Sequence, residues 1–183
     1  MSEWTLLVVG GVVILYVLWL YNGLVTLRNR VRNAWSQIDV QLRRRHELIP
    51  NQLESVKGYM AHERGVMEQV AQARQQAMAA GGDVAVRADA ENALSRSVRS
   101  LFAVAEAYPQ LRASDNMASF QEELSSTENR ISFARQHYND ATMEYNTAIE
   151  TIPRNIVATA FSFRPGVLFV AEEAERQPVK VKF

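Results

Sequence analysis

Residues 117–152 read MASFQEELSSTENRISFARQHYNDATMEYNTAIETI, and two interleaved seven-residue repeats run through them. The first repeat carries large side chains at Met117, Leu124, Ile131, Tyr138, Tyr145 and Ile152. The second carries mostly small ones at Phe120, Thr127, Ala134, Ala141 and Ala148. Residues spaced alternately by three and four form one seam along an α-helix, as in a coiled coil. This stretch therefore predicts a long helix that packs closely against its neighbours and ends at Pro153.

Three more helices are expected before this seam, because apolar residues recur there at spacings of three or four. The first is expected to bend or end near Pro50, since a proline disfavours the α conformation of the preceding residue. The second runs from Pro50 to the glycine pair at 81–82, and the third from about residue 87 to 107. An extended coiled coil is the alternative, but these breaks favour an all-α fold in which about four helices form an antiparallel bundle over residues 28–163.

The amino-terminal segment Thr5–Tyr21, TLLVVGGVVILYVLWLY, is almost wholly apolar, and no charged residue lies between Glu3 and Arg28. As a helix this uncharged window is about 36 Å long, enough to cross a hydrocarbon core of about 30 Å. A cleaved signal peptide is the alternative, but the acidic start, the long apolar run and the lack of a cleavage site argue against it. We therefore predict a transmembrane anchor over residues 1–27 that continues into the bundle.

Aromatic and basic residues mark the ends of this span. The residues expected at the two water–lipid interfaces are Trp4, Trp19 and Tyr21. Six arginines follow the span: Arg28, Arg30, Arg32, Arg43, Arg44 and Arg45. Only Glu3 and the terminal amine precede it, so the positive-inside rule places the amino terminus outside and the body in the cytoplasm.

The same arginines divide into two groups by their distance from the span. Arg28, Arg30 and Arg32 begin about two helical turns beyond Tyr21, so they are candidates for binding anionic lipid. The group Arg43, Arg44 and Arg45 stands roughly 35 Å beyond Tyr21 on a straight helix, so another protein is its expected partner. The alternative for both groups is solvated charge.

Residues 164–183 are expected to form an extended tail. They contain an apolar run at 167–170 and an alternation at 179–183, VKVKF, that fits a strand. A disordered terminus is the alternative. We expect the tail to latch onto this chain or a neighbouring subunit, because its apolar residues need a partner.

Polar residues on the predicted helices are interpreted first as structural. The helix-pairing candidates are Asp39, Glu128, Arg135, Asn139 and Asn146. Charged groups at the edges of a bundle usually form pairs between helices that set their register. Asn139 and Asn146, seven residues apart, could instead face a partner.

Composition and motifs exclude several function classes. The chain of 183 residues has 20 basic and 20 acidic side chains, which argues against nucleic-acid binding. It has no cysteine, so disulfides, thiolate nucleophiles and Cys-ligated metals are excluded. The three histidines at 46, 62 and 137 lie in neither H-E-x-x-H nor E-x-x-H motifs, and no phosphate-binding loop is present. We therefore expect no metal, no cofactor, no small-molecule substrate and no enzymatic activity.

The stretch 30–51, RVRNAWSQIDVQLRRRHELIPN, resembles the LemA family. Shorter matches occur at 56–59, 106–111, 127–131 and 134–135, and at the Tyr-Asn pairs 138–139 and 145–146. The resemblance spans nearly the whole chain. It implies a bacterial single-pass membrane protein with a cytoplasmic helical bundle, and it implies no catalytic residue.

These observations favour an interaction protein. The expected function is a membrane-anchored, non-enzymatic scaffold that self-associates or docks partner proteins at the cytoplasmic face. The expected partners are the lipid bilayer, further copies of this chain, and a membrane or cytoplasmic protein. The alternative is a membrane-shaping or pore-like ring of many single-span subunits.

Overall fold

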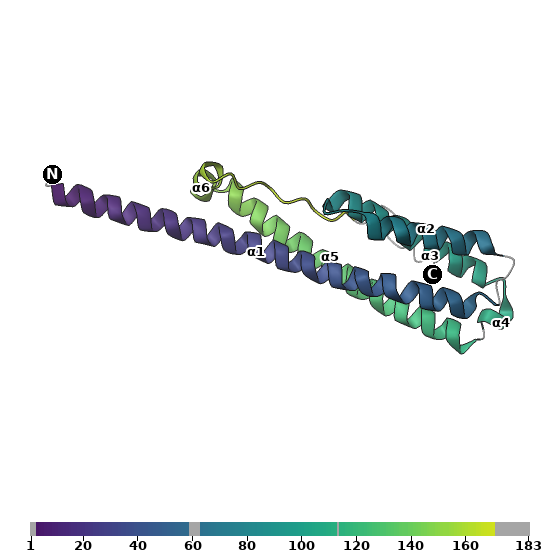
Figure 1. Cartoon of the computed structure of the whole chain (residues 1–183). Helices are drawn as coiled ribbons and strands as arrows, with labels where there is room; N and C mark the ends of the chain where they lie inside the picture. The colour runs from purple at the N-terminus through teal and green to yellow at the C-terminus, as the bar shows by residue number, and fades with distance from the viewer. Residues whose placement is uncertain (1–2, 59–62, 113, 171–183) are drawn as a thin grey trace, which may run out of the picture. The chain divides into compact units, whose positions relative to one another are not determined.

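The computed structural model describes residues 3–58, 63–112 and 114–170. Within them the elements are α1 (Glu3–Val56), α2 (Arg64–Ala79), α3 (Val84–Ala105), α4 (Pro109–Arg112), α5 (Asp115–Glu150) and α6 (Arg154–Ala160), as Figure 1 shows. The described part of the chain contains no strand. The predicted all-α fold, with a long apolar amino-terminal helix followed by a helical bundle, is confirmed.

The first helix was expected to bend or end near Pro50, and the end is wrong, because α1 continues through this residue to Val56. The second helix correspondingly begins at Arg64 and not at Pro50. A proline inside a helix has no N–H to donate to the carbonyl four residues earlier, which here is that of His46. Arg74 on α2 replaces the missing donor: its Nε lies 2.6 Å from the His46 carbonyl oxygen. A side chain far away in the sequence therefore satisfies the group that Pro50 leaves open.

The chain forms two compact units. Of the described residues, unit 1 comprises 3–38 and 134–168, and unit 2 comprises those within 39–133 together with 169–170, so α1 and α5 each contribute to both.

In unit 1, α1 and α5 lie antiparallel. Trp35 contacts Tyr138, with ring centroids 5.4 Å apart, and Arg30 pairs with Glu144 further along α5. The residue that comes earlier in α1 thus contacts the residue that comes later in α5. The core consists of Leu20, Leu24, Leu27, Tyr145, Ala148, Val157 and Ala158.

Helix α6 packs onto this core and ends in a defined turn. Ser162 has a positive φ of 56°, the Ser162 N–H donates to the Thr159 carbonyl, and the Phe163 N–H donates to the Ala158 carbonyl. This pair of hydrogen bonds is the Schellman termination, which usually places a glycine at the left-handed position. The turn directs Phe163 back onto Tyr21, where the ring centroids are 5.7 Å apart.

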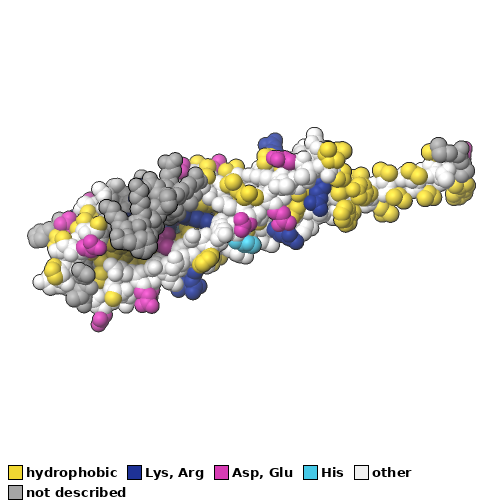
Figure 2. All heavy atoms as spheres, turned by 180° about the vertical axis from the view of Figure 1, so that it is seen from behind, with side chains coloured by type: hydrophobic (Ala, Val, Ile, Leu, Met, Phe, Trp, Pro, Cys, Tyr) yellow, Lys and Arg dark blue, Asp and Glu magenta, His cyan; other side chains and the backbone are white. Residues whose placement is uncertain are grey.

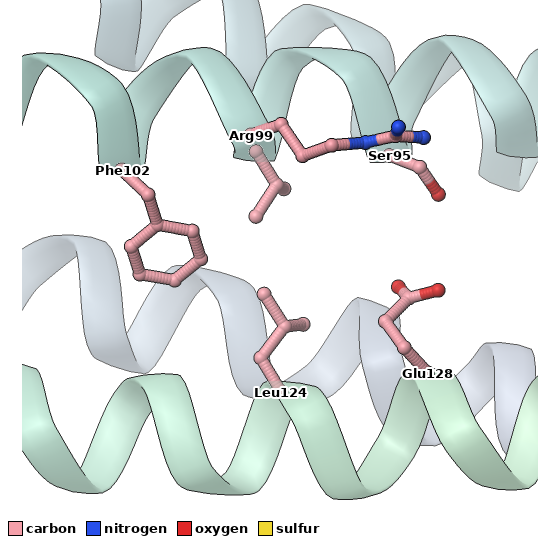
Figure 3. Close-up of a pocket in the computed structure, with 6 residues that line it drawn as sticks. Ser95, Arg99, Phe102, Leu124 and Glu128 are labelled. Atoms are coloured by element: carbon pink, nitrogen blue, oxygen red, sulfur yellow. The ribbon is translucent and has the colours of Figure 1, made fainter. Parts of the chain in front are cut away.

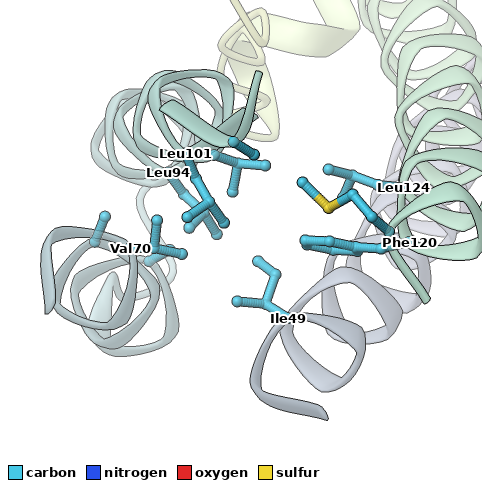
Figure 4. Packing of buried hydrophobic residues seen from close by; sticks show 11 residues of the cluster. Ile49, Val70, Leu94, Leu101, Phe120 and Leu124 are labelled. Atoms are coloured by element: carbon cyan, nitrogen blue, oxygen red, sulfur yellow. The ribbon is translucent and has the colours of Figure 1, made fainter. Parts of the chain in front are cut away.

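In unit 2, four helices share a core. Asp83 caps α3, because its carboxylate accepts hydrogen bonds from the backbone N–H groups of Ala85 and Val86. Figure 4 shows side chains from α1, α2, α3 and α5 converging on this core. Its buried members are Ile49, Val70, Ala73, Ala77, Leu94, Val98, Leu101, Ala105, Met117, Phe120 and Leu124.

The seven-residue seam is buried along most of α5. The buried members are Met117, Phe120, Leu124, Thr127, Ile131, Tyr138, Ala141, Tyr145 and Ala148. Ile152 was expected to extend the seam, and this is wrong: its side chain is 81% exposed. The reason is that α5 ends at Glu150, so Ile152 lies in the turn before α6.

The tail prediction holds for residues 164–170, which are extended and contact the rest of the same chain. The predicted strand at 179–183 lies outside the described residues.

Candidate functional site

The apolar end of α1 is exposed. Among the described residues, α1 is the one helix long and apolar enough to span a membrane, with a window of mean hydropathy 2.1 that is 6% buried. Figure 2 shows apolar side chains along this slender end of the molecule. An uncovered apolar surface of this size is unusual in a water-soluble protein and fits a lipid surrounding.

The aromatic residues at the ends of the span differ in burial. Trp4 and Trp19 are exposed, at 78% and 63%. Tyr21 is half-buried, and its ring packs against Phe161 and Phe163 with centroids 4.8 Å and 5.7 Å away. The structure thus joins Tyr21 to the segment that follows α6.

The first group of arginines also lies in unit 1. The Arg28 guanidinium is 5.1 Å from the centroid of the Phe163 ring, a cation–π distance. Arg30 lies 3.3 Å from the Glu144 carboxylate, and both side chains are mostly exposed. Arg32 is exposed. Arg30 and Arg32 thus have guanidinium groups that water or lipid can reach.

The second group does not form one surface. Arg43 is exposed and lies 2.7 Å from Asp39, one turn earlier, and Arg44 is exposed. The expectation that Arg45 faces a partner is wrong, because this side chain is fully buried. Its position explains this: Arg45 follows Ile38 and Leu42 and precedes Ile49 on the same buried stripe of α1.

Arg45 is the centre of a polar cluster inside unit 2. It forms ion pairs with Glu91 on α3 and with Glu128 on α5, the latter at 2.7 Å. The Arg45 Nη1 that pairs with Glu128 also donates a hydrogen bond to the Ser95 hydroxyl, at 2.8 Å. The His46 Nε2 lies 3.0 Å from the other oxygen of Glu91. We call Arg45, His46, Glu91, Ser95 and Glu128 the buried charge cluster.

Glu91 is the most deeply buried acid of this cluster. Burial alone raises the pKa of its carboxyl, but the neighbouring His46 imidazole and the charge of Arg45 together lower it more, so the pKa lies below the ordinary value. Glu91 is therefore ionised at neutral pH and is no proton donor there. The cluster joins α1, α3 and α5 and can hold these three helices in register.

The other helix-pairing candidates have diverse positions. Asp39 on α1 pairs with Arg87 on α3, with 2.5 Å between Oδ1 and Nη2. Glu128 belongs to the buried charge cluster. Arg135 is buried and Asn139 half-buried, both on α5. Asp39 and Glu128 thus connect helices through ion pairs.

Asn146 holds the tail of its own chain. Its amide donates to the Gly166 carbonyl at 3.0 Å and accepts from the Gly166 N–H at 2.8 Å. The hydroxyls of Tyr145 and Tyr138 donate to the carbonyls of Arg164 and Val167, at 2.9 Å and 2.7 Å. Burial raises the pKa of both tyrosines, although nearby Arg28 and Arg32 partly offset this for Tyr145. Both hydroxyls therefore remain hydrogen-bond donors, and side chains of α5 hold residues 164–167 by hydrogen bonds.

An open groove lies beside the buried charge cluster, between α3 and α5. It measures about 200 Å³ and is lined by Ser95, Val98, Arg99, Phe102, Leu124 and Glu128. Figure 3 shows the Glu128 carboxylate directed across the groove toward α3. Since Glu128 is already paired with Arg45, the groove offers no free catalytic pair. No group of three or more metal-ligating side chains occurs in the residues that the structure describes.

Sequence analysis missed His46, Arg87, Glu91 and Ser95. A signal for Glu91 was present: it precedes Leu94, Val98, Leu101 and Ala105 on one stripe of α3. A charge at such a position must be buried with a partner. The same signal applies to Arg45.

A family model described as the LemA family matches residues 34–183. The chain belongs to the LemA family. Among its relatives, Protein LemA of Metamycoplasma hominis is 27% identical over 158 residues, which cover 86% of this chain and 72% of the relative. The magnetosome proteins MamQ 2 and MamQ 1 of Paramagnetospirillum magneticum are each 24% identical over 184 residues, covering 87% of this chain and 68% of theirs. With its apolar exposed helix, this LemA family member is a membrane-associated protein.

Proposed function

We propose that this LemA family protein is a non-enzymatic scaffold, anchored by α1 in the inner membrane, that self-associates and docks partner proteins in the cytoplasm. One observation carries the proposal. A single uninterrupted helix is apolar and exposed at its start, then contributes Leu24 to the core of unit 1 and Ile49 to the core of unit 2. Such a helix couples a membrane position directly to a folded body.

The polar groups support a structural role over a chemical one. The most buried charges, Arg45 and Glu91, neutralise each other, and the second acid Glu128 binds the same guanidinium. Such clusters fix the register of one helix against its neighbours. The groove beside them is open and small, at about 200 Å³, below the usual range for enclosed ligand sites.

Membrane anchoring is tested by charge placed in the span. Val12 and Leu15 are both exposed in the apolar window, and arginine near the centre of a span costs about 2.5–3.5 kcal/mol per residue. We expect V12R with L15R to move the chain from the membrane pellet to the soluble or aggregated fraction. The control is V40R, an exposed apolar position further along α1, which should stay in the membrane.

Self-association is tested by mass. The full chain is measured by native mass spectrometry in mild detergent and in lipid nanodiscs, with negative-stain imaging of the same sample. Defined small oligomers support the scaffold. Monomers under both conditions contradict self-association, and large uniform rings favour the membrane-shaping assembly instead.

A further inference from the structure

The exposed apolar surface does not end with the span. In the turn before α6 and on α6 itself, Ile152 is 81% exposed and Ile156 67%, and Phe161 just after the helix is 55% exposed. These are three large side chains within ten residues, and α6 itself buries Val157 and Ala158 in the core of unit 1. Leaving such side chains in water is unfavourable, so a covering surface is expected.

The position of α6 along α1 indicates what that surface is. Val157 and Ala158 share a core with Leu20 and Leu24, and the Phe161 ring contacts Tyr21. A span of about 20 residues that begins at Thr5 ends near Leu24. Helix α6 therefore lies where α1 leaves the hydrocarbon and enters the headgroup layer.

Basic and polar groups surround the same place. A groove of about 270 Å³ is formed by Trp19, Leu20, Asn22, Gly23 and Thr26 of α1 together with Arg154, the first residue of α6. Arg28 lies against Phe163, two residues beyond Thr26 on α1. An apolar wall that carries a guanidinium at its edge suits one phospholipid, with the acyl chain along α1 and the phosphate on Arg154.

We propose that α6 is a second membrane contact, in which Ile152, Ile156 and Phe161 enter the interfacial layer of an anionic bilayer and Arg154 binds a phospholipid phosphate. The proposal rests on the proposed function, because it requires α1 to span the membrane. The protein then contacts the membrane at two places. The span fixes the depth of the chain in the bilayer, and α6 fixes the rotation of the folded body about the axis of the span.

The test uses the lack of cysteine in the chain. Single cysteines are introduced into the full chain by V12C, I156C and Q136C, and each is labelled with an environment-sensitive fluorophore. Gln136 is the control, since it is exposed on α5 about 21 Å before Glu150. The proteins are reconstituted in vesicles of phosphatidylcholine and phosphatidylglycerol that contain lipids with a nitroxide near the headgroup or at mid-chain.

We expect the probe at 156 to lose fluorescence most with the nitroxide near the headgroup and to emit at shorter wavelength than the probe at 136. The probe at 12 should lose most with the mid-chain nitroxide. If the probe at 12 is quenched while 156 behaves like 136, α6 is not at the membrane and the inference is overturned. Quenching at 156 and 136 alike also overturns it. If the probe at 12 is not quenched, the proposed anchor itself fails.

The phosphate contact has its own variant. R154Q should abolish the increase in quenching at 156 that phosphatidylglycerol produces over phosphatidylcholine alone, and R44Q, at an exposed arginine of unit 2, should leave it unchanged. If phosphatidylglycerol increases the quenching at 156 equally in R154Q and in the unmodified chain, Arg154 does not bind the phosphate.

Discussion

The arginine run 43–45 illustrates how neighbouring residues of one type acquire different roles. Three identical side chains in sequence face three directions of the helix, about 100° apart. Only Arg45 points into unit 2, where Glu91 and Glu128 neutralise it. Its two neighbours are exposed.

This difference gives the first prediction. R45M leaves Glu91 buried without its main counter-charge, so we expect a loss of about 3–5 kcal/mol in the free energy of unfolding. R44M, at the adjacent exposed position, should change it by less than about 0.5 kcal/mol. Denaturant unfolding in mild detergent, followed by circular dichroism, measures both. Equal effects of the two changes would show that Arg45 is not buried as described.

Glu91 gives a prediction for pH. Its pKa is lower in the folded protein than the ordinary 4.5, so the folded state binds fewer protons there than the unfolded state. Its contribution to stability is therefore complete above pH 4.5 and is lost as the pH falls through the lowered pKa. E91Q should be less stable at neutral pH yet decline less steeply on acidification. E68Q, at an exposed acid, should decline in parallel with the unmodified chain, and a parallel decline of E91Q would contradict the assignment.

The sequence allowed the span and the helical seam to be predicted, but not which side chains pair with each other in the folded chain. The span follows from an unbroken apolar run and the seam from a seven-residue repeat, and both are local features of the sequence. The pairing of Arg45 with Glu91 joins positions 46 residues apart, and no local pattern gives that distance. What the pattern did offer was a charge on each apolar stripe, which is a reason to expect a buried ion pair.

At the scale of elements, α1 shows how tertiary contacts override a helix-breaking residue. Pro50 leaves the His46 carbonyl without its usual donor, and Arg74 of α2 supplies one. This long-range repair explains why the break expected at residue 50 is absent.

The repair predicts a coupling between the two positions. R74M should destabilise the chain by about 1–3 kcal/mol, since it leaves a partly buried carbonyl unsatisfied. In the P50A background the new N–H of residue 50 can donate to His46, so the same R74M change should cost clearly less. A double-mutant cycle on the unfolding free energy measures this, and additive costs would refute the repair.

The packing of the tail against α5 predicts a second coupling, between Gly166 and Thr142. A Cβ on Gly166 would lie 2.9 Å from the Thr142 Cγ2, too close for the tail to keep its place against α5. G166A should therefore cost about 1–3 kcal/mol. T142S removes that methyl group and keeps the hydroxyl, so G166A should be better tolerated in T142S than in the unmodified chain. Unfolding curves of the four proteins give the coupling; no rescue by T142S would show that the crowding lies elsewhere.

At the scale of the whole molecule, the orientation in the membrane follows from charge. Basic residues follow the span at 28, 30 and 32, and one acidic side chain precedes it within the described residues. Because basic flanks remain in the cytoplasm, we expect the start of α1 outside and the body that follows the span inside. In the cysteine-free chain, E3C should react with a membrane-impermeant maleimide on intact cells, whereas S119C, exposed on α5, should react only after lysis. The reverse pattern would place the helical body on the outer face and contradict the proposed docking of cytoplasmic partners, and labelling of both sites on intact cells would exclude a single fixed orientation.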